Sequence, residues 1–258
     1  MSAIRWIRSR RRSTTTPANM APFPDILFTS SNDTYATLAG HPGTTHIRWI
    51  DLLVWLSTLL VPLLIIQRGM RRSLQLNKSL PVKPSKLTPL EKALMPIHTV
   101  SFFMPTLVYL VGSLQACLHQ PQWAWWSECA LPDDPRADTL RLAACGLSVV
   151  CAWCLNSAFT HLGTQVHHIG VREKPKTVET GPFSVVRHPM YSAVIVQQFL
   201  HIIMFWSLFP LAAAFITAGA MVMKISPEER LRELDPEAGP DYVAYKRKVP
   251  SKLIPYIW

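Results

Sequence analysis

Residues Leu140–Leu162 read LRLAACGLSVVCAWCLNSAFTHL, an apolar stretch interrupted by one charged side chain, Arg141. A helix of about 20 predominantly apolar residues crosses the hydrocarbon layer of a membrane. The stretch therefore predicts a transmembrane helix, and similar stretches lie on both sides of it. We expect about five crossings, near Ile50–Ile66, Leu94–Leu118, Leu140–Leu162, Tyr191–Phe205 and Leu211–Met223. The last two are short and are predicted to form a tight hairpin that turns at Pro210.

The composition agrees with these spans. Of the 258 residues, 49% are hydrophobic and only 16% are charged, whereas soluble domains carry about 25% charged residues. The charged residues are distributed unevenly, because long apolar stretches that lack them alternate with short basic segments. The sequence therefore predicts an all-α, polytopic integral membrane protein.

The net charge of +10 does not indicate a nucleic-acid partner, because the Lys and Arg residues lie beside apolar spans, as in the positive-inside pattern of membrane proteins. The segments that follow the first, third and fifth spans are basic, whereas the segment after the second is acidic. Five spans place these three basic segments on one side and the Arg-rich N-terminus on the other, too far from the first span to count much in the orientation. We therefore expect a bilayer as partner and a cytosolic C-terminus.

The chain is expected to have three parts. Residues 1–45 are predicted to be a disordered basic leader, with an organelle-targeting role as the alternative because they are rich in Arg, Ser and Thr. Residues 46–162 hold the first three spans with their connecting loops, and residues 163–258 hold the last two spans and the tail. The five cysteines, which include a CxxC at Cys151 and Cys154, are interpreted as packing residues because no second ligand pair completes a metal site.

The segment Thr180–Tyr191, TGPFSVVRHPMY, is the first candidate site. Gly181–Pro182 predicts a turn, and Pro189 suits the first turn of a helix. Arg187 and His188 then stand at a helix N-terminus on the membrane rim, which suits a carboxylate or phosphate ligand. The alternative is an interfacial Arg and His with no ligand.

Two further clusters follow in the sequence. Lys224 and Glu228 are four residues apart on one helical face, and Pro227 is expected to interrupt that helix. An ordinary helix-terminal ion pair is the alternative there. The tail Gly239–Trp258, GPDYVAYKRKVPSKLIPYIW, is compatible with an amphipathic helix that lies on the bilayer with an aromatic anchor.

These three segments, in this order, resemble the isoprenylcysteine carboxyl methyltransferase family. The resemblance covers about Ala158 to Trp258. It rests on Gly181 with Phe183, Arg187-His188-Pro189-Met190-Tyr191, Glu228-Glu229, Gly239 with Tyr242 and Tyr245, and Val249-Pro250, with Phe159-Thr160-His161 upstream. Arg-His-Pro-x-Tyr alone is less specific, because phospholipid N-methyltransferases share it and membrane sterol reductases have something like it.

The resemblance implies an enzyme of the endoplasmic reticulum that methylates the C-terminal carboxylate of prenylated CaaX-type proteins. It implies that residues 163–258 form a cytosolic, S-adenosylmethionine-binding catalytic region, with a substrate-facing cation four residues before Glu228, at Lys224. We expect Lys224 or Arg187 to be the catalytic cation that steers this carboxylate, and we expect no metal. The resemblance also implies that S-adenosyl-L-methionine is held by Gln165, Lys176, Thr177, Val178, Phe183, His188, Pro189, Met190, Tyr191 and Glu228.

The chain departs from the family pattern at several positions. Lys224 stands where the family usually has Arg, and Ala193 stands where Gly is usual. A Lys keeps the positive charge but lacks the planar fork that binds a carboxylate through two hydrogen bonds. The stretch Lys176–Val178 also lacks the His that the family has before the turn.

The chemistry of this reaction needs few protein groups. An α-carboxyl group has a pKa of about 3.5 and is already ionised at neutral pH, so no general base is required.

Three other functions stay open from the sequence. A phospholipid N-methyltransferase would need a base for its amine acceptor, for which His188, Glu229 or His161 would serve. The other two are an NADPH-dependent membrane reductase and a non-catalytic membrane scaffold.

Overall fold

The computed structural model describes residues 48–118, 123, 125, 128–167 and 169–258. The predicted leader, residues 1–45, lies outside the described residues. Over the described part the secondary structure is helical, and β-pairing is limited to two isolated bridges, Val82 with Arg172 and Ala130 with Ser207. The prediction of an all-α polytopic membrane protein is confirmed.

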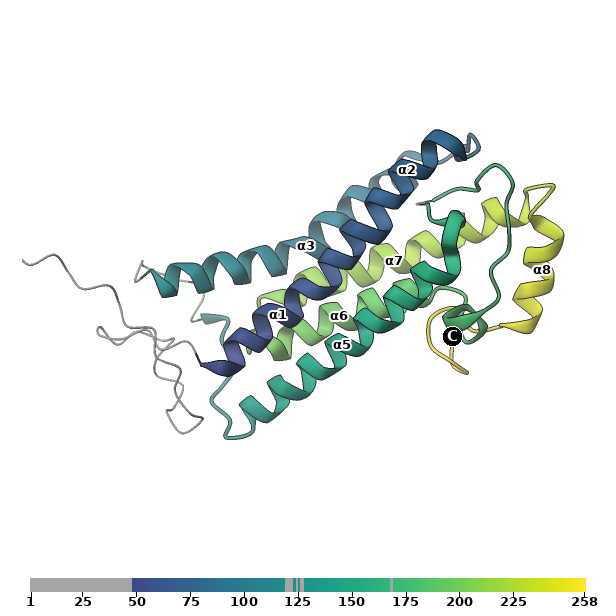
Figure 1. Cartoon of the computed structure of the whole chain (residues 1–258). Coiled ribbons are helices and arrows are strands. Elements are labelled where there is room, and N and C mark those ends of the chain that lie inside the picture. The colour runs from purple at the N-terminus through teal and green to yellow at the C-terminus, as the bar shows by residue number, and fades with distance from the viewer. Residues whose placement is uncertain (1–47, 119–122, 124, 126–127, 168) are drawn as a thin grey trace, which may run out of the picture.

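The helices follow one another along the chain as a bundle capped by shorter elements (Figure 1). The first half contains α1 (Trp49–Leu64), the π-helix η2 (Ile65–Met70), α2 (Arg71–Ser79) and α3 (Pro89–Cys117). The second half contains α5 (Ala137–Leu162), the 3₁₀ turns η3 (Gly163–Gln165) and η4 (Gly181–Ser184), α6 (Pro189–Met204), α7 (Pro210–Glu233) and α8 (Gly239–Lys248).

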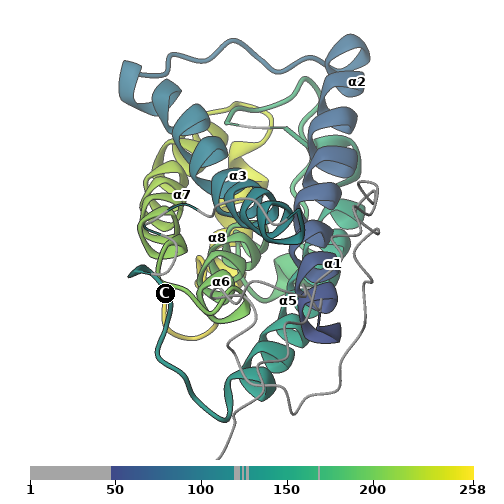
Figure 2. The same cartoon turned by 90° about the vertical axis from the view of Figure 1, so that its left-hand side faces the viewer.

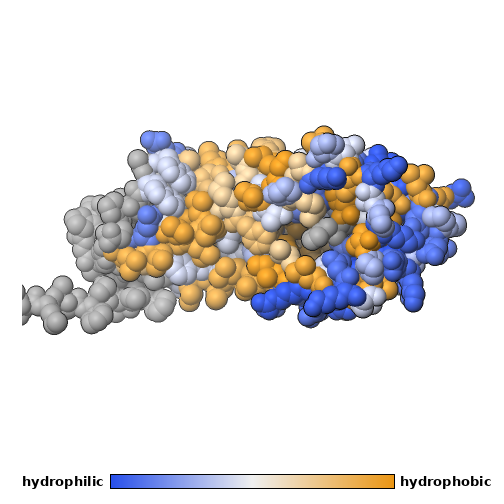
Figure 3. Space-filling model, turned by 90° about the horizontal axis from the view of Figure 1, so that it is seen from above, coloured by the Kyte–Doolittle hydropathy of each residue, from blue (hydrophilic) through white to orange (hydrophobic). Residues whose placement is uncertain are grey.

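Four helical segments are long and apolar enough to cross a membrane: Trp49–Ser79, Pro89–Cys117, Ala137–Gln165 and Pro210–Glu233. The fourth predicted span is also a helix, α6, but its 16 residues extend about 24 Å at a rise of 1.5 Å per residue, which is less than the ~30 Å hydrocarbon layer. Figure 3 shows apolar side chains over the middle of the molecule and hydrophilic ones toward the end that holds α2 and α8. The chain is an integral membrane protein.

Prolines set several helix boundaries where the sequence predicts them. Pro189 and Pro210 begin α6 and α7, so the predicted hairpin forms. The expectation that Pro227 interrupts its helix is wrong, because α7 continues through Pro227 to Glu233. Proline removes one backbone donor, and a membrane helix tolerates this loss where neighbouring helices and side chains supply other partners.

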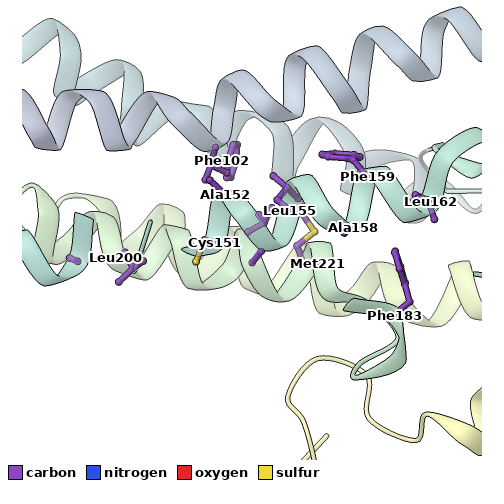
Figure 4. Packing of buried hydrophobic residues seen from close by; sticks show 14 of the residues in the cluster. Phe102, Cys151, Ala152, Leu155, Ala158, Phe159, Leu162, Phe183, Leu200 and Met221 are labelled. Atoms are coloured by element: carbon purple, nitrogen blue, oxygen red, sulfur yellow. The ribbon is translucent and has the colours of Figure 1, made fainter. Parts of the chain in front are cut away.

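The core lies where α5 packs against α1 and α6, while α3 and α6 both pack on α7. Figure 2 shows α6 among the other helices of the bundle. Small side chains of α5, among them Ala144, Ala152 and Ala158, are buried and let the neighbouring backbones approach closely. Leu155 and Met221 meet beside them (Figure 4). Cys145 and Cys151 belong to the same core, as expected of packing residues.

The loop between η3 and η4 is tied to the end of α2 by Arg172. This side chain is fully buried and donates to the carbonyls of Val166 and Leu80 and to the side chain of Asn77. Burial lowers the pKa of Arg172, but the carbonyl oxygens satisfy its donors. The connection fixes the loop across the hydrophilic end of the bundle, next to the cavity described below.

Candidate functional site

A cavity opens near the hydrophilic end of the bundle, and η2, α2, α3, α5, α6, α7 and α8 contribute to its wall. The cavity and its open, solvent-connected mouth together contain about 990 Å³ of space not occupied by protein atoms. Apolar side chains of α5 and α7, such as Leu155, Phe159 and Met221, form one part of the wall. The structure also brings most of the predicted site residues to this cavity: Phe183, Arg187, His188, Pro189, Met190, Tyr191, Lys224 and Glu228.

The turn that precedes α6 is shaped by Gly181. Its φ of +62° lies in the left-handed region that side chains disfavour, and a Cβ atom there would lie 2.5 Å from the His161 ring. The hydroxyl of Tyr245 donates to the carbonyl of Phe183 over 2.7 Å and closes the turn from the other side. Figure 4 shows Phe183 pointing from this turn toward the helices. Burial raises the pKa of Tyr245, so its hydroxyl stays protonated as a donor.

Glu228 is a buried carboxylate with two close partners. The Tyr191 hydroxyl donates to Oε2 over 2.7 Å, and Nη2 of Arg232 donates to Oε1 over 3.0 Å. His188 Nδ1 lies 3.9 Å from Oε2. The rings of His188 and Tyr191 are stacked with their centroids 5.3 Å apart. These contacts fix the carboxylate and the two rings together on the cavity wall.

Glu229 has a different position from its neighbour Glu228. Its Oε1 accepts from Nε of Arg187 over 2.8 Å and lies 3.2 Å from Nε2 of His188, while Lys246 Nζ lies 3.3 Å from Oε2. Because a carboxylate oxygen can only accept a hydrogen bond, His188 Nε2 must carry a proton to lie this close to Glu229 Oε1. The Glu229 carboxylate thus joins the start of α6 to α8.

Arg187 is tied to the tail as well as to Glu229. Its Nη1 donates to the carbonyls of Val249 and Pro250 over 2.8 and 2.6 Å. The side chain is buried but still lines the cavity. Arg187 therefore holds the tail against the start of α6, whatever contact it makes with a ligand.

Lys224 is a buried cation without a direct counter-ion. Its side chain is on α7, the residue is 3% exposed, and Nζ lies 5.1 Å from the centroid of the Tyr191 ring. Within the described residues its ammonium makes no hydrogen bond and no ion pair within 4 Å. A buried charge is costly unless it is paired, so an anionic ligand in this cavity would be strongly favoured.

A smaller cavity of about 310 Å³ lies beside the first. Three predicted cofactor residues line it: Gln165, Lys176 and Thr177. The two cavities share the side chains of His167, Arg232 and Tyr242. Val178 lines neither cavity and packs against the core instead. The predicted cofactor residues thus fall into two adjacent groups.

Several wall residues were not predicted. Arg232 lies four positions after Glu228 on α7, a spacing that the sequence displays and that would have identified it. Met70 and Ser73, at and after the π-helix η2, and His98 of α3 also line the larger cavity. They belong to the half of the chain that the family resemblance does not cover, so only the packing of α1 and α3 places them here. A π-helical turn is rare and is frequently found at functional sites.

Residues 140–232 match the model of the phospholipid methyltransferase family. This segment runs from α5 to Arg232 and carries both Lys224 and Glu228. It indicates a membrane methyltransferase. That broad family also includes the isoprenylcysteine carboxyl methyltransferases. No curated protein matches the chain significantly.

Membrane methyltransferases of this kind generally use S-adenosylmethionine, and the wall residues fit that group. The rings of Phe183, Tyr191 and Tyr242 suit its adenine. The carboxylate of Glu228 suits its positively charged methionine part, and the apolar side chains keep water away from its methyl group. The residues that would hold S-adenosylmethionine therefore lie around both cavities.

Proposed function

We propose that this protein transfers a methyl group from S-adenosylmethionine to the C-terminal carboxylate of a prenylated cysteine, in prenylated CaaX-type proteins. The observation that carries the proposal is Lys224, whose buried ammonium has no ion-pair partner within 4 Å among the described residues and lines a largely apolar cavity. An acceptor that joins an anion to a lipid chain complements both properties of this cavity. The chain's own resemblance to the isoprenylcysteine carboxyl methyltransferases points the same way.

The transfer is a single displacement. A carboxylate oxygen forms a bond to the methyl carbon while the bond from that carbon to sulfur breaks and its electron pair stays on sulfur. No proton moves, so no general base is needed. The opposite charges of acceptor and sulfonium both decrease in the transition state, so a site that excludes water favours the reaction. Alignment of the two reactants supplies a further part of the rate.

The side chains take distinct roles in this proposal. Lys224 neutralises and orients the acceptor carboxylate, and Arg187 contributes a second positive charge beside it. Glu228, held by Tyr191 and Arg232, binds the positive part of the cofactor. The prenyl chain lies along the apolar wall of α5 and α7 and reaches it from the lipid. We further propose residence in the endoplasmic reticulum with the C-terminus in the cytosol.

A phospholipid N-methyltransferase is the second candidate, and the description of the matched family favours it. An amine acceptor must lose a proton before it attacks. His98 and His167 line the larger cavity, and an imidazole is a suitable base near neutral pH. In that case Lys224 would contact the phosphate of the lipid headgroup instead of a carboxylate.

Transfer of labelled methyl from S-adenosylmethionine distinguishes these functions. Membranes that contain the protein are offered N-acetyl-S-farnesylcysteine or phosphatidylethanolamine. The control variants are Glu228→Gln, which alters the cavity, and Glu237→Gln, which alters an exposed carboxylate. We expect base-labile label on farnesylcysteine, lost in Glu228→Gln and retained in Glu237→Gln.

Other outcomes would overturn the proposal. Label on phosphatidylethanolamine alone would establish the N-methyltransferase. If neither acceptor is labelled and S-adenosylmethionine does not bind to the purified protein, a scaffold or an NADPH-dependent reductase becomes the better explanation.

A further inference from the structure

The segment after α8 ends in an ordered turn whose apolar side chains have no cover in the structure. Tyr256 is 99% exposed and Ile257 is 79% exposed. The turn is nevertheless closed by its backbone, because the amides of Leu253 and Ile254 donate to the carbonyl of Trp258 and the amide of Trp258 donates back to Ile254. Four large apolar side chains are therefore held outward by a defined backbone: Ile254, Tyr256, Ile257 and Trp258.

Tyr256 adopts a backbone conformation that its own side chain disfavours. Its φ is +62°, in the left-handed region where glycine or asparagine is the usual residue. Its amide donates to the hydroxyl of Ser251 over 3.0 Å, which holds the conformation. The described part of the chain does not cover this side chain, so packing there does not offset the strain. A contact with another molecule would offset it.

The turn lies next to a helix that faces lipid. The hydroxyl of Ser192, in the first turn of α6, donates to the carbonyl of Leu253 over 2.7 Å. Val196, one helical turn further along α6, is 48% exposed on the outside of the bundle. In Figures 1 and 2 the tail turns back from α8 toward the helices and ends at the outer edge of the bundle. The same bilayer that the long helices cross is thus within reach of the turn.

The charges around the turn complement a membrane surface. Lys252 lies with Nζ 5.4 Å from the centroid of the Trp258 ring. The last turn of α8 adds Arg247, whereas its neighbours Lys246 and Lys248 are paired with Glu233 and Glu179. Tyrosine and tryptophan collect at the boundary between headgroups and hydrocarbon, and basic residues near it attract anionic lipids. We propose that residues Ile254–Trp258, the apolar turn, insert into the interfacial layer of the bilayer.

The insertion would bear on the cavity through the backbone of the tail. The amides of Arg187 and His188 donate to the carbonyls of Ser251 and Lys252 over 3.0 and 2.9 Å. The segment that supports the apolar turn is therefore the segment that holds the start of α6. Contact with the bilayer would hold Arg187 and His188 in position at the rim of the larger cavity.

Depth-dependent fluorescence quenching tests the insertion without any assay of activity. The five native cysteines are replaced by alanine, and an environment-sensitive fluorophore is attached to Ile257→Cys. The matched control is Leu234→Cys. Leu234 is also well exposed, at 74%, but it directly follows the last residue of α7 and lies outside the apolar turn. The protein is placed in nanodiscs of phosphatidylcholine and phosphatidylserine.

We expect lipids with a doxyl group near the headgroup to quench the label at position 257, and iodide in the buffer to quench the label at position 234. Quenching of position 257 by iodide alone would overturn the proposal. Protection of position 257 from both quenchers would overturn it as well, because the turn would then lie in a contact between copies of the chain.

A second measurement keeps the test independent of cysteine replacement. In the same nanodiscs, trypsin should cut after Lys252 several-fold faster in the Tyr256→Ser/Ile257→Ser protein than in the unaltered chain. Leu234→Ser should leave that rate unchanged. Equal cleavage of all three proteins would contradict the insertion.

Discussion

Among the residues of the larger cavity, Lys224 combines burial, charge and the lack of a counter-ion. The other charged side chains nearby are already paired: Glu228 with Arg232, and Glu229 with Arg187 and Lys246. A ligand adds little electrostatic stabilisation to a charge that already has a partner. It stabilises a buried charge without a close partner much more. The affinity of the site for an anion therefore depends mainly on this one side chain.

Replacing Lys224 with methionine keeps the volume and removes the charge. A hydrogen bond to a charged group contributes about 1.5–3 kcal/mol, so we expect kcat/KM for the acceptor to fall by about 10- to 100-fold. Affinity for S-adenosylmethionine should stay unchanged. Initial rates and calorimetric binding of the cofactor measure the two effects.

Two matched variants control this experiment. Lys224→Arg should retain most of the activity, because it keeps the positive charge that the family usually places there. Lys248→Met, which alters an exposed lysine paired with Glu179, should behave as the unaltered protein. A loss of cofactor affinity in Lys224→Met would instead assign the ammonium to the carboxylate of S-adenosylmethionine.

At the scale of the element, the turn η4 depends on the close approach of Gly181 to the end of α5. The His161 ring lies against the glycine, and Nδ1 of His161 is 2.8 Å from the carbonyl of Ser157. The ring is thus held by its own helix and has little freedom to move away. This contact joins two motifs of the family resemblance, which are separated by the loop that Arg172 fixes.

Gly181→Ala should therefore destabilise the protein for two separable reasons. The positive φ costs a non-glycine residue about 1–2 kcal/mol, and the clash with His161 adds to this. The double variant Gly181→Ala/His161→Ala should recover the part due to the clash and keep the part due to φ. Thermal unfolding in detergent measures both.

Gly219→Ala is the matched control, because a Cβ atom at Gly219 meets no atom within 4 Å. It should leave the stability unchanged or raise it slightly, since alanine is a better helix former than glycine. If Gly181→Ala were as stable as this control, the proposed constraint on the turn would be wrong.

At the scale of the whole molecule, the end of the bundle away from the cavity is held by a buried network of charges. Arg141 of α5 donates to Asp51 of α1 over 2.7 Å and to the carbonyl of Met204, the last residue of α6, over 3.0 Å. Arg48 extends the network to both Asp51 and Asp138. Three helices are therefore joined at one end, while the ligand site lies at the other.

Asp51→Ala should destabilise the fold by about 3 kcal/mol, because removing one partner of a buried ion pair is strongly destabilising and leaves Arg141 with only the longer contact to Asp138, at 3.8 Å. Asp51→Ala/Arg141→Met should recover much of that loss, since no unpaired charge then remains. Chemical unfolding in micelles gives the free energies. Both variants should keep the KM of the unaltered enzyme, and a changed KM would show that the two ends are coupled.

The sequence by itself determined the membrane class and most of the helices, because the length and the apolar character of a span are local properties. It also located the residues of α6 and α7 that face the cavity, through the family motifs and their spacing. A helix was predicted at the position of α6, but with 16 residues α6 is not among the four described helices that are long and apolar enough to cross a membrane. Pro227 was the local error, since the sequence does not display the neighbours that stabilise a helix around a proline.

The tertiary structure alone decided which charges are paired and which is not. The sequence left open, as the alternative to a ligand site, that Lys224 and Glu228 form an ordinary ion pair four residues apart. In the fold Glu228 bonds to Tyr191 and Arg232, and Lys224 lines the cavity. Only the packing of the first half of the chain brings Met70 and His98 to the wall. The physical reason is that pairing and burial depend on distances between residues far apart in the sequence, whereas hydropathy and spacing are read along it.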